Sequence, residues 1–243
     1  MSGHSHWHSI KYQKGIADQK RGKVFSKMSR EISIAAKDKG KDPDSNPSLR
    51  IAVEKAKKFN MPKDNIERAI KRGTGELKEA ELESFVFEAY GPGNVALIIE
   101  GITDNNKRTF QDIKQILSQN NGKIANEGSV KWMFEKKGVI TLSLESQEPK
   151  ISKEDLELKI IESGAEDFFW HENLLEIYSK VENLEKIKNN LENQKIKTEG
   201  SSVDWVAKNK VQVEKKELDS CEKLFEALDE SDDVQETYSN LQD

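Results

Sequence analysis

Apolar residues recur every three or four positions through the first part of the chain, which is the period of an amphipathic helix. Between residues 9 and 72 this pattern predicts a small helical bundle, interrupted by the Pro- and Asp-rich stretch at residues 42–47. Ser48 is positioned to cap the helix that follows the interruption. In the first helix the predicted buried stripe consists of Phe25, Met28, Ile32 and Ala36.

Lysine and arginine residues follow a second face of that first helix. Lys20, Lys23, Lys27 and Arg30 recur with helical spacing. At about 100° per residue they centre roughly 140° away from the apolar stripe. One helix could therefore pack through its apolar face and bind a partner through its basic face.

Strand and helix patterns alternate beyond the acidic run at residues 76–83, which is predicted to be a linker. A strand at 95–103, a helix at 107–120 and a strand at 129–134 precede a predicted turn at 136–138. The next six elements have the ferredoxin-like order β-α-β-β-α-β, namely a strand to residue 144, a helix at 153–163, strands at 165–170 and 174–179, a helix at 181–193 and a strand at 196–206.

The end of the chain predicts half of another such unit, with a strand at 210–213, a helix at 215–228 and a strand at 233–238. Joined to the half unit before residue 136, it would complete a second β-α-β-β-α-β arrangement. The predicted fold class is therefore α+β, with an N-terminal helical bundle followed by two ferredoxin-like domains, one inserted into the other. The predicted domains are residues 1–78, residues 79–135 plus 208–243, and the inserted residues 136–207.

Charge is divided unevenly along the chain. The first 75 residues hold 18 Lys and Arg against 8 Asp and Glu, a net charge of +10, whereas the whole chain sums to −5 and the rest therefore carries −15. A basic segment on an acidic protein is typical of a surface that docks a polyanion, most commonly a phosphate backbone. The alternative is a solvated, lysine-rich surface.

Composition argues against several other classes of function. No stretch approaches the roughly 18 apolar residues of a membrane span, and no apolar run follows the opening residues, so we expect a cytoplasmic protein without a membrane partner. Cys221 is the single cysteine and has apolar neighbours at helical spacing, which favours a buried, inert thiol. No catalytic motif is recognisable, so we expect no enzyme activity, catalytic residues, cofactor, bound metal or small-molecule substrate.

Two short motifs resemble binding sites but have simpler interpretations. Residues 91–96 fit the dinucleotide fingerprint G-x-G-x-x-G/A, yet strands are predicted on both sides, so a hairpin turn is the better interpretation. His4, His6 and His8 alternate and could loosely bind a metal, although a tail that contacts a polyanion or is merely solvated is favoured. Trp7 could stack on a base or anchor the tail on the bundle.

Two further polar segments are predicted to be structural. Residues 104–109 lie between a strand and a helix, where they would cap the helix, and Arg108 could alternatively touch a phosphate. His171 belongs to a predicted turn between two strands and is not part of a catalytic pair.

Several motifs, in order along the whole chain, make the sequence resemble the YebC/PmpR family. They are Gly3-His-Ser-x-Trp7-x-x-Ile10-Lys11, Lys20-Arg-Gly-Lys23-x-Phe25-Ser-Lys27, Asp42-Pro-Asp44, Asn46-Pro47, Asn60-Met61, Tyr90-Gly-Pro-Gly93, Glu127-Gly-Ser-Val130 and Asp232-Asp-Val-Gln235. The resemblance implies a three-domain cytoplasmic protein of a family long described as DNA-binding transcriptional regulators. It also implies relatives in translation, among them a mitochondrial translational activator of cytochrome oxidase and bacterial members linked to ribosomes stalled on proline-rich sequences.

We therefore expect a non-enzymatic, nucleic-acid-binding regulator of gene expression, with DNA as the partner of a transcriptional regulator. The alternative is a ribosome-associated translation factor whose partner is ribosomal RNA, and an adaptor that binds proteins through its sheets is a third possibility. The resemblance carries over the basic positions Lys11, Lys20, Arg21, Lys23 and Lys27. The complete predicted set of nucleic-acid-binding residues is Lys11, Lys14, Lys20, Arg21, Lys23, Lys27 and Arg30.

Overall fold

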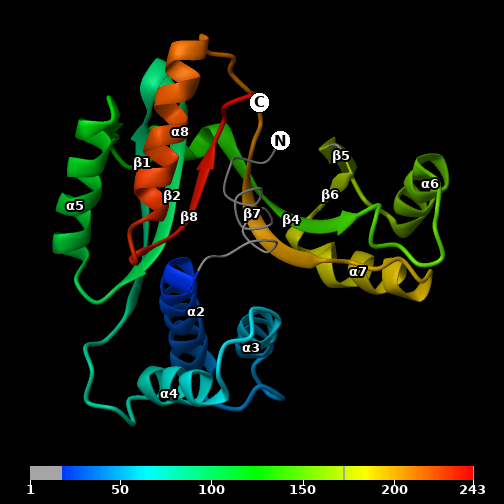
Figure 1. Cartoon of the computed structure of the whole chain (residues 1–243), viewed down its shortest axis with the longest axis horizontal. Coiled ribbons are helices and arrows are strands. Elements are labelled where there is room, and N and C mark those ends of the chain that lie inside the picture. The colour runs from blue at the N-terminus through cyan, green and yellow to red at the C-terminus, as the bar shows by residue number, and fades with distance from the viewer. Residues whose placement is uncertain (1–17, 172, 243) are drawn as a thin grey trace.

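Three groups of secondary-structure elements meet near the centre of the molecule (Figure 1). The structure, a computed structural model, describes residues 18–171 and 173–242, with side chains from residue 21 onward. A helical bundle is followed by two four-stranded antiparallel sheets, each with its own pair of helices. The predicted α+β class with an N-terminal helical bundle is confirmed.

The bundle consists of α2 (Asp18–Lys39), α3 (Pro47–Lys58) and α4 (Lys63–Gly73). The apolar stripe predicted for the first helix packs inward, because Met28, Ile32 and Ala36 are buried and Phe25 is partly buried against the same core. Ser33 also joins two helices, since its hydroxyl donates to the carbonyl of Ala69 at 2.8 Å. The rest of the buried core is Ala35, Leu49, Ala52, Val53, Ala56, Met61, Ile66 and Ala69.

Asn46, and not Ser48, caps α3. The buried Asn46 side chain accepts a hydrogen bond from the Leu49 amide at 3.1 Å and donates to the carbonyls of Ala35 and Gly40 at 2.7 and 2.8 Å. The prediction of a Ser48 cap was wrong because Pro47 is the first residue of the helix, a position that suits proline, so the helix begins earlier than expected.

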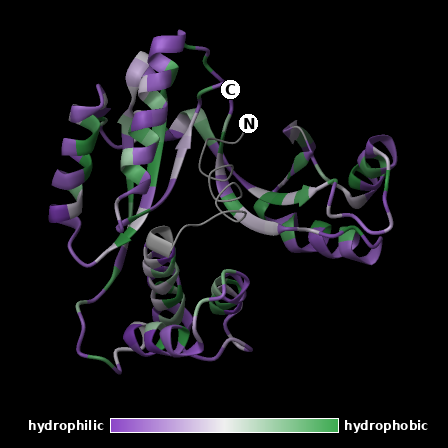
Figure 2. Ribbon diagram, in the orientation of Figure 1, coloured by the Kyte–Doolittle hydropathy of each residue, from purple (hydrophilic) through white to green (hydrophobic). Residues whose placement is uncertain are grey.

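The first sheet has the strand order β3-β1-β2-β8. It is covered on one face by α5 (Asn106–Gln119) and α8 (Lys215–Asp229), whose apolar side chains share one buried core with β1 and β2. Figure 2 shows these apolar residues in green along β2 and on the inner sides of both helices. The four strands are β1 (Glu83–Tyr90), β2 (Ala96–Thr103), β3 (Lys123–Ile124) and β8 (Val234–Ser239).

This first sheet is assembled from different strands than predicted. Residues 129–134 are not a strand, since Lys131–Met133 form a 3₁₀ turn, and the stretch 210–213 contributes only an isolated bridge between Val211 and Leu241. One reason is the buried Glu88 on β1, whose carboxylate accepts the amides of Gly128, Val130 and Lys131 and so occupies donors that a strand would use. β1, the hairpin partner of β2, lies beside β2 in the place predicted for residues 210–213. The strand order is therefore not the ferredoxin-like one predicted for this unit.

The second sheet has the order β5-β6-β4-β7 and follows the predicted β-α-β-β-α-β sequence of elements. Its strands are β4 (Phe134–Ser143), β5 (Asp167–His171), β6 (Leu174–Ser179) and β7 (Gly200–Ala207), and its helices are α6 (Lys153–Ser163) and α7 (Leu184–Asn193). The turn predicted at residues 136–138 was wrong, because β4 runs straight through it. Gly138 permits this path, since a Cβ there would lie 2.5 Å from the Ser179 hydroxyl oxygen.

The two sheets are connected through the chain and through packing. The last strand, β8, pairs with β2, so the second sheet is formed by residues that lie between strands of the first. Phe134, Trp205 and Tyr238 lie in one buried cluster where the two sheets meet. In the part of the chain that the structure describes, every helix is too short or too polar to cross a membrane.

We expect Asn46→Ala to lower the free energy of unfolding by roughly 2–4 kcal/mol, because it removes a helix cap and the side-chain donor to the carbonyls of Ala35 and Gly40. Urea unfolding measures this loss. Ser48→Ala is the matched control and should cost less than about 0.5 kcal/mol, because Ser48 is exposed. A larger loss in Ser48→Ala than in Asn46→Ala would contradict the assignment of the cap.

Candidate nucleic-acid interface

The residues predicted to bind nucleic acid fall into three groups. Lys11 and Lys14 lie outside the described residues, as do His4, His6, His8 and Trp7. Lys20 is in the first turn of α2, but its side chain is not among those described. Arg21, Lys23, Lys27 and Arg30 are all on α2, where the structure brings three of them together against another part of the protein.

Those three side chains form what we call the α2–α8 contact, between Lys23, Lys27 and Arg30 and the acidic residues Asp229, Glu230 and Asp233. Lys27 Nζ lies 2.6 Å from Asp229 Oδ1, and Lys23 pairs with the carboxylate of Glu230. Arg30 Nη1 lies 2.9 Å from Asp233 Oδ1 and also donates to the carbonyl of Ile102 at 2.9 Å. Asp229 and Glu230 lie at the C-terminal end of α8, where the helix dipole also favours cations, and Asp233 lies directly before β8.

Asp233 is the most enclosed member of this contact. Its Oδ2 accepts from the Thr109 hydroxyl at 2.5 Å and from Arg108 Nη2 at 3.0 Å, and its side chain is 10% exposed. Burial alone would raise the pKa of Asp233, but the hydrogen bonds from Thr109 and Arg108 and the charge of Arg30 outweigh it, so the pKa lies below its usual value. The carboxylate is therefore ionised and binds two guanidinium groups.

The basic face of α2 is thus in large part an internal interface. The side chains of Lys27 and Arg30 are only 15% and 16% exposed to solvent, so a phosphate chain could reach them only if the α2–α8 contact opened. The charge count could not reveal this arrangement, because partners about 200 residues apart carry no local signal.

The acidic run at residues 76–83 connects α4 to β1, as the sequence predicted, and it also pairs with the bundle. Glu79 contacts both Arg68 and Arg72, while Glu76 contacts Lys41 and Glu81 contacts Lys37. These are mostly exposed pairs, which contribute little to stability but lower the local positive charge. They reduce the number of bundle cations that face solvent without a partner.

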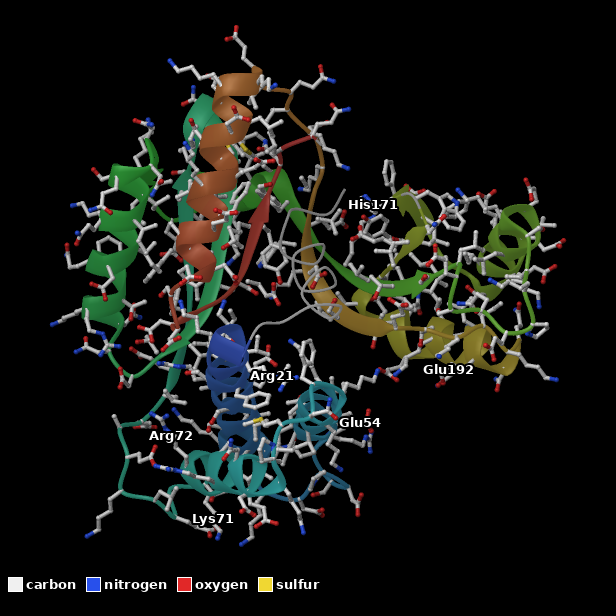
Figure 3. All side chains as sticks on the ribbon, in the orientation of Figure 1. Arg21, Glu54, Lys71, Arg72, His171 and Glu192 are labelled. Atoms are coloured by element: carbon white, nitrogen blue, oxygen red, sulfur yellow. The ribbon has the colours of Figure 1, made fainter. Side chains whose placement is uncertain are left out.

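Several bundle cations remain exposed, and no ion pair joins them to any described residue. Arg50 and Lys57 lie seven residues apart on the same side of α3, with Glu54 between them, and Lys71 lies on α4, on the side facing away from both sheets (Figure 3). These three side chains form what we call the outer basic surface, defined as Arg50, Lys57 and Lys71.

A cavity of about 270 Å³ lies where the bundle approaches the second sheet. Its lining comes from α2, from the end of α3 and from the segment that leads into β7. The residues are Arg21, Val24, Phe25, Lys58, Phe59, Asn60 and Glu199. Cationic, aromatic and carboxylate groups therefore meet at one place, which sequence reasoning missed because each segment looks ordinary by itself.

The other motifs singled out in the sequence have structural roles. Residues 91–95 form the tight turn between β1 and β2, with Gly93 at φ 64°, so the hairpin interpretation is confirmed. Asn105 caps α5 by accepting the Arg108 amide, and Arg108 itself pairs with Asp104 and Asp233. Cys221 is fully buried, and burial followed by the charges of Glu217 and Glu222 raises the pKa of its thiol to about 11.

The sequence did not indicate the buried carboxylate of Asp204, whose pKa is raised. Asp204 on β7 is buried, and this burial, together with repulsion from Glu176 and Glu100, raises the pKa of Asp204 to about 7 despite a hydrogen bond from Ser202. Among the described residues no group of three or more His, Cys, Asp and Glu side chains is arranged to hold a metal ion.

Comparison with protein families matches nearly all of the chain. Residues 5–76 match the TACO1/YebC protein N-terminal domain, and residues 82–241 match the TACO1/YebC second and third domain. The chain belongs to the TACO1/YebC family. The family resemblance drawn from the sequence motifs is therefore confirmed.

Relatives of this TACO1/YebC protein cover it end to end. A protein of Halothermothrix orenii is 46% identical over 99% of the chain and 95% of its own length, and one of Natranaerobius thermophilus is 45% identical over 99% and 96%. Both are named "probable transcriptional regulatory protein". The crystal structure of a conserved hypothetical protein from Aquifex aeolicus superimposes with a TM-score of 0.88 at 40% identity, covering 98% of this chain and 97% of that one.

We expect Asp233→Asn to lower the free energy of unfolding by about 3 kcal/mol at pH 7, because Arg30 and Arg108 lose the charge that compensates them. The pKa of Asp233 in the folded protein lies below its usual value, so ionised Asp233 stabilises the fold. This contribution is fully present above about pH 4 and is lost as the pH falls through the pKa of the folded state. Urea unfolding from pH 7 downward should show the gap between wild type and variant narrowing below about pH 4.

The neighbouring Asp232→Asn is the matched control for this measurement. Asp232 is exposed, and no ion pair joins it to any described residue, so its stability should follow the wild type throughout. A gap for Asp233→Asn that stays constant into the acid range would contradict the assigned charge state.

Proposed function

We propose that this TACO1/YebC protein is a non-enzymatic regulator of gene expression that binds nucleic acid through its helical bundle. The names of its relatives favour transcription, so DNA is the first partner to test. The observation that carries the proposal is the outer basic surface, because its cations face solvent on the one part of the chain that has a large positive net charge. Phosphates that bind there release condensed counterions, a gain that weakens as salt rises.

The outer basic surface replaces the basic face of α2 as the principal phosphate contact in this proposal. Lys23, Lys27 and Arg30 already bind carboxylates of the same chain, so they would contribute only after the α2–α8 contact opened. Lys11, Lys14 and Lys20 remain predicted contacts, and Arg21 keeps its predicted role. The acidic remainder of the chain repels the same polyanion and so favours an approach from the side of the bundle.

The proposed surface predicts a specific loss of binding. We expect the triple variant Arg50→Glu, Lys57→Glu and Lys71→Glu to bind DNA at least about tenfold more weakly than wild type, with a shallower dependence on salt, because three phosphate contacts become repulsive. Fluorescence anisotropy of a labelled duplex over a series of salt concentrations measures both quantities.

A second triple variant separates this surface from net charge. Lys114→Glu, Lys186→Glu and Lys223→Glu make the same change of charge at exposed positions on α5, α7 and α8. This control should bind nearly as tightly as wild type. Equal losses in the two triple variants would mean that total charge, and not the outer basic surface, governs binding.

Two further measurements test the target. A regulator of transcription should protect a promoter site in DNA footprinting, and this protection should disappear in the Arg50, Lys57 and Lys71 variant. The second measurement is sedimentation with ribosomes. If wild type sediments with ribosomes and this variant does not, and neither protein gives a DNA footprint, then translation and not transcription is the regulated step.

A further inference from the structure

The cavity between α2, α3 and β7 has the chemistry of a site for a nucleobase. We propose that it binds one unpaired nucleotide of a single strand, with guanine as the preferred base. This inference rests on the proposed function and deepens it. The outer basic surface would bind any phosphate backbone, whereas the cavity would recognise one particular base.

Aromatic walls are the first observation. Phe25 and Phe59 both line the cavity, and both are only partly buried, with one side packed on the core of the bundle. Aromatic rings that stand at the edge of a core are suited to stacking on a base, because every base has a π-face and gains from contact with a ring. Val24 adds apolar surface to the same wall.

The end of α3 holds this wall in place. Asn60 has a left-handed backbone with φ 58°, its amide donates to the carbonyl of Lys57 at 2.9 Å, and the amide of Met61 donates to the carbonyl of Ala56 at 3.0 Å. These two bonds are the hydrogen-bond pattern of a Schellman helix end, and Met61 is buried against the bundle. Phe59 and Asn60 are therefore positioned before any ligand arrives.

Charged groups divide the cavity into two kinds of surface. Arg21 and Lys58 are exposed cations suited to a phosphate, and Lys58 Nζ also donates to the Glu199 carbonyl at 3.3 Å, which links the bundle to the segment before β7. The carboxylate of Glu199 has no hydrogen bond or ion pair with any described residue. A carboxylate only accepts hydrogen bonds, so it repels a phosphate and attracts a base edge that presents N–H donors.

These groups together select the ligand. Guanine presents two adjacent N–H donors on its pairing edge, whereas uracil presents one, so Glu199 should favour guanine over uracil. In a duplex that edge is already paired, so only an unpaired nucleotide can use it. At about 270 Å³ the cavity is slightly smaller than the roughly 300–1,000 Å³ of typical ligand pockets, so it suits one nucleotide and not a helix. Lys57 and Arg50 lie beyond Lys58 on α3 and would follow the adjoining phosphates.

The test compares eight-nucleotide single strands that differ only in a central guanine or uracil, as RNA and as DNA, by fluorescence anisotropy with the full chain at one salt concentration. We expect wild type to prefer the guanine strand about tenfold. We expect Glu199→Gln to reduce that ratio to near one, because the guanine strand loses the carboxylate that accepts its N–H donors, while the affinity for the uracil strand rises or stays constant as a negative charge is removed. Glu185→Gln, at an exposed site on α7, is the matched control and should keep the wild-type ratio.

The aromatic wall is tested separately with Phe59→Leu, which keeps apolar volume in the core but removes the ring. We expect both strands to bind about tenfold more weakly, the size of effect that one stacked base supplies. Phe168→Leu, a partly buried ring in the core of the second sheet, should leave binding unchanged. Thermal unfolding of both variants checks that each is folded.

The outcomes separate this inference from the proposed function. If wild type binds single strands with the expected salt dependence, but Glu199→Gln keeps the guanine ratio and Phe59→Leu keeps the affinity, the cavity proposal is wrong and the outer basic surface stands. If wild type binds no nucleic acid of any kind, both are wrong. Equal guanine preference on RNA and DNA indicates recognition of the base alone, whereas a preference limited to RNA adds contact with the 2′-hydroxyl.

Discussion

The position of the bundle against the first sheet depends on the buried carboxylate of Asp233. It binds Arg30 on α2 and both Arg108 and Thr109 on α5, so a single side chain joins the bundle to the first sheet. Arg30 and Asp233 are both largely withdrawn from water, and such charges are tolerated only when their partners are in place. Because the position of α2 follows from this contact, the cavity between the bundle and the second sheet follows from it as well.

The positive charge of the bundle is divided between two environments in this TACO1/YebC protein. Part of the positive charge of the bundle is neutralised within the chain, by the end of α8 and by the acidic residues between α4 and β1. The part that remains faces solvent on α3 and α4. A phosphate chain would therefore encounter a smaller basic surface than the charge count implies, displaced from the basic face of α2.

The hydrophobic and polar pattern predicted the helices and strands that are determined by residues close together in the sequence. The stripe through Met28 and Ile32 predicted the buried side of α2, and alternation predicted nearly every element of the second sheet. The strands of the first sheet could not all be predicted, in part because the buried Glu88 accepts amides some 40 residues away in a stretch predicted to be a strand. The sequence identified cations on α2 but not their partners, and the cavity joins residues 21–25, 58–60 and 199, so no single stretch of sequence indicates it.

The pairing of β8 with β2 has a consequence for how the chain is made. Residues 96–103 leave the ribosome long before residues 234–239, so the first sheet stays incomplete until translation is almost finished, whereas residues 134–207 already contain every strand of the second. The carboxylates at 229–233 emerge equally late. A nascent chain therefore carries Lys23, Lys27 and Arg30 without their final partners, and the finished protein covers these cations only at the last step of its own synthesis.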